Sequence, residues 1–245
     1  MRDLLKRQTL QAGLAELVGT FFLALAALLA PAPYTALAVG LTLAAFVYAL
    51  GDISGCNVNP AVTLGLVATR RLPPAVGVLY VVAQLAGATL ARLLAPLIAP
   101  LPSYAAAPPA GEVIGVGFLV LTVLAVSTKF VPKSGSGVAI GAALLAGLLA
   151  GLLTTRGVLN PAIALAMGLG GTPALWGPLA GALVFGPLAL LYLPSSDKKP
   201  APSADTKSAD RRGSGLARPW RPAAKPGSPD SPRMGSPRTF TTRHK

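Results

Sequence analysis

The chain has 245 residues, of which 53% are hydrophobic and 12% are charged, and its formal net charge is +13. Soluble domains average about 25% charged residues, so this composition argues against a soluble protein and predicts a multi-pass membrane protein. The chain contains one cysteine, Cys56, and one histidine, His244, which excludes an intrachain disulfide and a histidine-based metal site or catalytic triad in its apolar part. We therefore expect no enzyme and no metal site.

The basic residues are unevenly distributed along the chain. Twelve of the 21 Lys and Arg residues follow position 197, in a segment rich in Pro and Ser. We expect residues 195–245 to form a disordered tail, residues 1–11 to form a polar N-terminal segment, and residues 12–194 to form one membrane domain. Because this charge adjoins apolar spans, the expected partner is lipid rather than nucleic acid.

Apolar runs separated by short Pro- and Gly-rich loops predict an all-α fold. Two of these runs are too short to cross a bilayer, which takes roughly 20 residues. Six spans are expected at 12–30, 34–51, 74–98, 111–130, 138–153 and 173–193, and the two short runs at 59–69 and 160–169. The segment KSGSG, at 133–137, is expected to be a turn before the fifth span.

Each short run begins with the same triplet, Asn-Pro-Ala. The two copies are Asn59, Pro60 and Ala61, and Asn160, Pro161 and Ala162. Proline is tolerated in the first turn of a helix, and asparagine is a favoured residue immediately before that turn. The triplets therefore predict two half-helices, whose positive N-terminal ends and amide side chains point toward a common site.

The two halves of the chain repeat each other. Glu16 in AELVGTFFLAL corresponds to Glu112 in GEVIGVGFLVL, and each precedes one Asn-Pro-Ala triplet. Three spans per half is an odd number, so the second half must be inverted in the membrane, an arrangement that places a solute site at the midplane. Each carboxylate could relay protons, but the pattern favours acceptors for the backbone N–H groups of the re-entrant loops.

The charges of the loops predict the orientation in the membrane. The Lys and Arg residues of the N-terminus, of two loops and of the tail fall on one side of a six-span topology; those in the loops are Arg70, Arg71, Lys129 and Lys133. Of the opposite loops, 31–34 and 99–110 contain no Lys or Arg, and Arg156 alone stands on that side. By the positive-inside rule, both termini are expected in the cytoplasm, with the domain spanning the cell membrane.

With these motifs the chain resembles the aquaporin and aquaglyceroporin (major intrinsic protein) family. The resemblance rests on AELVGTFF, GDISGCNVNPAVTLGL, YVVAQLAGA, GEVIGVGFLV, VLNPAIALAMGL and WGPLAGAL, and it covers about residues 10–195. It implies a homotetramer with one pore in each protomer and no cofactor. It also implies that the triplets meet at mid-membrane, where the amides of Asn59 and Asn160 donate hydrogen bonds to a passing solute.

The expected outer constriction departs from the family pattern. The corresponding positions are Val39, Leu148, Gly157 and Ile163. Most members of the family are expected to carry an arginine where this chain has Ile163, and aromatic residues or a histidine elsewhere in the ring. Our hypothesis is a wider, less polar mouth that passes water and neutral solutes such as glycerol, urea or ammonia, while ions and protons are excluded.

Three further residues fall near the expected pore. Arg156 either turns its guanidinium toward the space beside Ile163 or reaches the lipid headgroups. Asn57 and Cys56 are expected in the cytoplasmic half of the pore. Two other functions stay open from the sequence: a non-conducting membrane protein on the same scaffold, and an ion-coupled secondary transporter.

Overall fold

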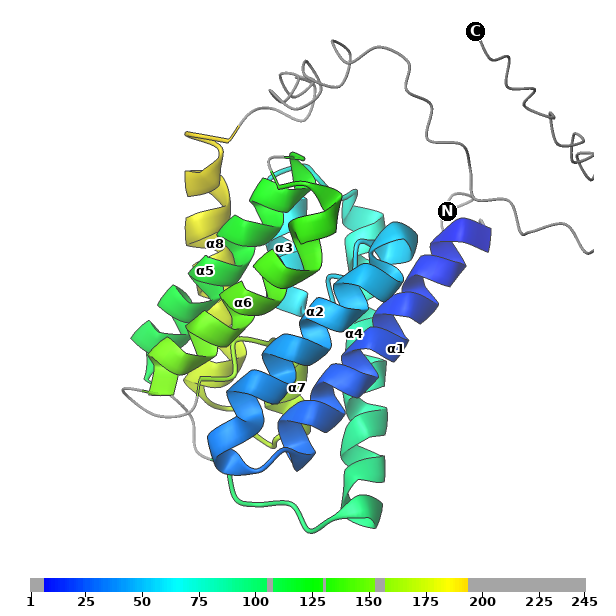
Figure 1. Ribbon diagram of the computed structural model, residues 1–245, viewed down its shortest axis with the longest axis vertical. Coiled ribbons are helices and arrows are strands. Elements are labelled where there is room, and N and C mark those ends of the chain that lie inside the picture. Colours follow the sequence, from blue (N-terminus) through cyan, green and yellow to red (C-terminus); the bar gives the residue numbers. More distant parts are fainter. Residues whose placement is uncertain (1–6, 105–107, 130, 153–156, 194–245) are drawn as a thin grey trace, which may run out of the picture. The chain divides into compact units, whose positions relative to one another are not determined.

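The computed structural model of the protein describes residues 7–104, 108–129, 131–152 and 157–193 (Figure 1). In this part of the chain there are helices, one 3₁₀ turn and connecting loops, and no strand. The elements are α1 (Arg7–Leu29), η1 (Ala32–Tyr34), α2 (Thr35–Ser54), α3 (Pro60–Ala68), α4 (Pro74–Ile98), α5 (Pro109–Ser127), α6 (Lys133–Leu152), α7 (Pro161–Ala166) and α8 (Pro173–Ala189).

The lengths of the helices confirm an all-helical membrane fold. Helices α1, α2, α4, α5 and α6 are long and apolar enough to cross a bilayer. Helix α8 has 17 residues, which is the lower limit for a span of about 17–25 residues. Helices α3 and α7, with nine and six residues, cannot cross it.

Two expected boundaries were wrong. The segment KSGSG is not a turn, because α6 already begins at Lys133. Gly137 in this stretch, and Gly141 one turn further on, lie against α2, so close helix packing outweighs the low helix propensity of Gly and Ser. Helix α1 also begins earlier than expected, at Arg7. The predictions for residues 1–6 and for 195–245 lie outside the described residues.

Prolines determine where most of the helices begin. The first residue of a helix is a proline in α3, α4, α5, α7 and α8, where its missing N–H would have no partner within the helix. Three more prolines lie inside helices, Pro96 in α4 and Pro178 and Pro187 in α8. Membrane helices tolerate such residues because neighbouring groups satisfy the freed backbone atoms.

The inverted repeat is visible in how the helices pack. Helix α1 packs on α4 in the first half, and α5 packs on α8 in the second. A Cβ atom added to Gly87 of α4 would lie 2.3 Å from the Leu17 carbonyl oxygen of α1. The equivalent Cβ atom on Gly181 of α8 would lie 2.6 Å from the Val113 carbonyl oxygen of α5. In both halves, therefore, the close packing at the seam between the two helices depends on a glycine that lies against a backbone carbonyl oxygen of the neighbouring helix.

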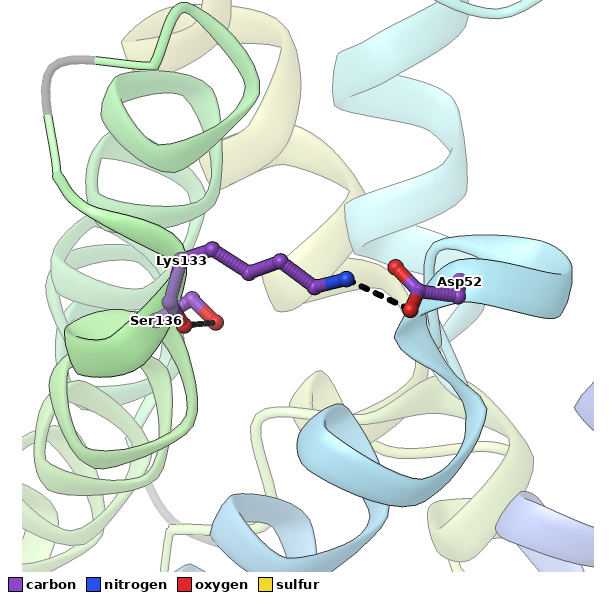
Figure 2. A network of polar contacts seen from close by, with 3 residues as sticks. All are labelled: Asp52, Lys133 and Ser136. Atoms are coloured by element: carbon purple, nitrogen blue, oxygen red, sulfur yellow. Dashed lines mark hydrogen bonds and ion pairs between the residues drawn. The ribbon is translucent and has the colours of Figure 1, made fainter. Parts of the chain in front are cut away.

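A third seam joins the two halves through α2 and α6. Gly40 and Gly141 face each other there, and an added Cβ on either would lie within 3.0 Å of the other's carbonyl oxygen. At the end of this seam the Lys133 ammonium pairs with the Asp52 carboxylate, as Figure 2 shows. The Tyr48 hydroxyl donates to the Ser134 carbonyl nearby, at 2.8 Å.

Removing the ion pair between Lys133 and Asp52 is expected to change stability very little. Both side chains are largely exposed, at 78% and 73%, and exposed pairs contribute less than about 1 kcal/mol. Lys133→Ala should therefore unfold at nearly the same denaturant midpoint as the parent protein in detergent micelles. A loss of several kcal/mol would mean that this end of α6 depends on the pair and not on the packing of its glycines.

Candidate functional site

Each of the two short helices begins at its Asn-Pro-Ala triplet. Asn59 and Asn160 both have extended backbones and lie immediately before α3 and α7. The Asn59 Oδ1 atom accepts a hydrogen bond from the Ala61 N–H at 2.8 Å, and the Asn160 Oδ1 atom accepts one from the Ala162 N–H at 3.0 Å. These bonds cap the helices and fix which way each amide nitrogen points.

The two asparagines also bind each other's loops. Asn59 Nδ2 donates to the Leu159 carbonyl at 2.8 Å, and Asn160 Nδ2 donates to the Val58 carbonyl at 2.9 Å. The residues joined in this way are 100 and 102 positions apart in the sequence. The two triplets are therefore in direct contact, and each amide holds the backbone that precedes the other.

A buried glutamate supports each loop. The Glu16 carboxylate accepts from the Asn57 and Val58 N–H groups at 2.8 and 2.6 Å. The Glu112 carboxylate accepts from the Val158 and Leu159 N–H groups at 2.9 and 2.7 Å. Because no α-helix or sheet pairs with these N–H groups, the carboxylates provide the partners that a re-entrant loop in a membrane needs.

The residue before each asparagine has an unusual backbone conformation. Val58 and Leu159 have φ values of 45° and 56°, in the left-handed region that branched and bulky residues rarely adopt. This conformation turns their N–H groups toward the glutamates and their carbonyls toward the opposite asparagine. The strained backbone is thus held by hydrogen bonds at both ends.

The first loop has additional polar support. Ser54 Oγ and Gln84 Nε2 also donate to the Glu16 carboxylate, at 2.7 and 2.8 Å. The same Gln84 nitrogen donates to the Thr63 hydroxyl of α3 at 2.9 Å. Sequence reasoning missed these residues, although an uncharged polar residue inside an otherwise apolar span, as in AQLAGA, was a usable signal for Gln84.

A narrow cavity lies at the level of the two asparagines. Its volume is about 10 Å³, close to the roughly 10–15 Å³ that one water molecule needs on this measure. Asn57, Asn59 and Asn160 line it, together with apolar side chains. The site therefore has room for about one water molecule beside the amide groups.

A larger cavity of about 290 Å³ adjoins the narrow one. We call it the vestibule; its walls are the end of α1, the start of α2, the segment 99–104 and the loop before α7. All four described residues of the expected constriction line it, namely Val39, Leu148, Gly157 and Ile163. Val39 and Ile163 also line the narrow cavity, which places them between the two spaces.

The structure separates the remaining candidates. Asn57 lines the narrow cavity and Cys56 lines neither of these two cavities, because its side chain is packed among apolar residues. Arg156 lies outside the described residues. The described part of the chain holds no cluster of three His, Cys, Asp or Glu residues that could bind a metal ion.

The comparisons of the sequence with known proteins all point to one family. The sequence model for "Major intrinsic protein" matches residues 3–192. Aquaporin AqpM of Methanothermobacter thermautotrophicus is 34% identical over 142 residues, which are 51% of this chain and 58% of that protein. Aquaporin NIP1-4 of Oryza sativa subsp. japonica is 34% identical over 200 residues, 71% of this chain and 73% of that protein. The match with AqpM thus spans little more than half of its length.

A solved structure has the same fold. The X-ray structure of the aquaglyceroporin from Plasmodium falciparum superposes with a TM-score of 0.60, covering 75% of this chain and 99% of that one. The sequence identity is 20%, so this similarity concerns the fold.

Proposed function

Because the chain belongs to the major intrinsic protein family, we propose that it is a passive membrane channel for water and small neutral solutes. The proposal rests above all on the reciprocal bonds of Asn59 and Asn160 beside a cavity of about 10 Å³. A path of this kind needs neither a nucleophile nor a cofactor, and it moves solutes only down their gradients.

The hydrogen bonds of each asparagine leave one donor for the solute. An amide nitrogen carries two N–H groups, and in Asn59 and Asn160 one of them binds the opposite carbonyl. The two remaining N–H groups can donate to the oxygen of one water molecule and orient it. Because the oxygen of this water accepts both N–H groups, it cannot also accept a hydrogen bond from the next water. The chain of hydrogen bonds that would carry a proton is interrupted at this point.

The rest of the passage disfavours ions. The side chains of Val39, Leu148 and Ile163 offer no polar atom to replace an ion's hydration shell, and removing that shell is costly. Both short helices also present their positive N-terminal ends to the centre. A neutral solute meets neither obstacle, so we propose that the channel excludes ions and protons.

Transport by purified protein in liposomes tests the proposal. We expect osmotic water flux well above that of protein-free vesicles, together with flux of at least one of glycerol and urea, and no conductance for a small cation. Absence of water flux in folded protein would instead favour a non-conducting membrane protein. A flux that follows an ion gradient would favour a coupled transporter.

Replacing the second asparagine tests the role of its amide. In Asn160→Ala the donor beside the narrow cavity and the bond to the Val58 carbonyl are lost, and a hydrogen bond contributes about 0.5–1.5 kcal/mol. We expect proton leak to rise roughly two- to tenfold, measured with a pH-sensitive dye inside the liposomes. Thr122→Ala is the control, because that hydroxyl is exposed and bonds within its own helix, to the Phe118 carbonyl. If the proton leak of Asn160→Ala is unchanged, the Asn160 amide does not contribute to proton exclusion.

The orientation and assembly of the channel are also proposals. The basic loops support a topology with both termini in the cytoplasm and the domain in the cell membrane. The family supports a homotetramer with one pore per protomer. Accessibility of a single introduced cysteine to an impermeant thiol reagent would test the first, and the mass of the protein–detergent complex would test the second.

A further inference from the structure

The vestibule exposes very few polar side-chain atoms to a solute. Among its described lining residues, Thr35 and Tyr104 carry the hydroxyl groups. The Thr35 hydroxyl donates to the Ala30 carbonyl at 3.1 Å, and the Tyr104 hydroxyl donates to the Leu28 carbonyl at 2.9 Å. Each hydroxyl therefore uses its single hydrogen to bind a backbone carbonyl at or just after the end of α1 rather than a solute.

The constriction below the vestibule is apolar on its described sides. Val39 and Ile163 lie between the two cavities, and Leu148 lines the vestibule beside them. These three side chains are 4%, 2% and 7% exposed and contain carbon and hydrogen alone. A polar group of a solute therefore gives up water at this level and gains no side-chain hydrogen bond from these residues.

The narrow cavity is polar on one side. Asn57, Asn59 and Asn160 lie on that side, while Leu23, Leu43, Leu119 and Leu144 line the same space. The two remaining N–H groups of Asn59 and Asn160 suit one acceptor oxygen of a solute. A polar group turned away from these amides would lie against leucine side chains.

We propose that this channel favours small neutral solutes that combine one hydrogen-bonding end with an alkyl body, and disfavours polyols and diamides of equal size. The inference rests on the proposed channel function and specifies its substrate class. Its physical basis is that a dehydrated polar group without a partner costs free energy, whereas a methyl group loses nothing on leaving water. An apolar site rejects a solute that carries an additional hydroxyl by no more than about a hundredfold, so the expected preference is modest.

Two matched pairs of solutes test the preference. Acetamide replaces one amino group of urea with a methyl group, and 1,2-propanediol replaces one hydroxymethyl group of glycerol with a methyl group. After subtraction of the flux through protein-free liposomes, we expect the methyl member of each pair to move about tenfold faster, which corresponds to about 1.4 kcal/mol. Equal rates, or faster urea and glycerol, would overturn the inference while leaving the channel function intact.

A substitution of equal volume tests the origin of the preference. Val39→Thr exchanges one methyl group for a hydroxyl that can donate and accept inside the constriction. We expect the preference for acetamide over urea to fall at least about threefold. Val78→Thr is the matched control, because Val78 is 66% exposed on α4 and lines neither cavity.

The possible outcomes separate the two proposals. If the unmodified protein conducts neither water nor any of the solutes, the channel function itself is contradicted. If the unmodified protein shows the tenfold preference and Val39→Thr does not change it, the constriction is not the origin of the preference. If Val39→Thr does not fold, Leu148→Gln places a polar group in the same ring from α6, and the rates of the unmodified protein still decide whether the preference exists.

Discussion

Replacing Gly87 with alanine is expected to prevent α1 and α4 from packing in their native positions. The added Cβ would lie 2.3 Å from the Leu17 carbonyl oxygen and 3.0 Å from the Phe21 nitrogen, both of which are backbone atoms that cannot rotate away. The helices must separate to relieve this contact, and close approach through small residues is what stabilises helix pairs in a membrane. We expect the free energy of unfolding to fall by at least about 1–3 kcal/mol, the usual cost of overpacking.

Resistance to denaturation in detergent, followed by circular dichroism, measures this effect. Gly51→Ala is the control, because an added Cβ there would meet no atom within 4 Å and Gly51 also lies in a helix. That change should be neutral or stabilising by up to about 1 kcal/mol, the difference in helix propensity between the two residues. Equal stability of Gly87→Ala and Gly51→Ala would show that the α1–α4 seam tolerates separation. Gly181→Ala is expected to behave like Gly87→Ala, since it meets the Val113 carbonyl oxygen at 2.6 Å.

Removing the carboxylate of Glu112 is expected to disorganise the loop before α7 and to abolish transport. In Glu112→Leu the Val158 and Leu159 N–H groups both lose their acceptor. Each buried donor left unsatisfied costs about 1–3 kcal/mol, so the combined loss is about 2–6 kcal/mol. Leu159 also needs this support for its φ of 56°, and its carbonyl receives the amide of Asn59.

Graded substitutions separate the loss of hydrogen bonds from the loss of packing. Glu112→Gln keeps one acceptor oxygen at nearly the same volume and should retain an intermediate stability and reduced water flux. Ile114→Leu, at a position that is 52% exposed on the same helix, should leave both unchanged. If Glu112→Leu transports water normally, the carboxylate is not what holds the loop, and the backbone must find other partners.

Much of the fold followed from two sequence patterns. Apolar runs of bilayer length predicted an all-helical membrane protein, and this is confirmed by the helices and by the family match. The Asn-Pro-Ala triplets predicted helices beginning at Pro60 and Pro161, which is where α3 and α7 begin. Local rules sufficed here because proline and asparagine act on the backbone of their immediate neighbours.

Other features depend on contacts that no local rule describes. The start of α6 at Lys133 was missed because a run of Gly and Ser has weak helix propensity, and only its packing on α2 overrides that preference. The bonds from Gln84 to Glu16 and Thr63 were missed because they join three separate helices. The proposed roles of the constriction residues stay predictions, since they concern what passes through the site and not where the side chains lie.

The crossed amide bonds at the centre have a consequence for how the protein is made. During synthesis the first half enters the membrane with the Asn59 amide still lacking the Leu159 carbonyl, and the Val58 carbonyl still lacking the Asn160 amide. Neither half can supply these two bonds by itself, so both amides at the centre are bound only once residues of both halves are in place. A chain whose synthesis stops before residue 159 would lack both of the bonds that join the two loops.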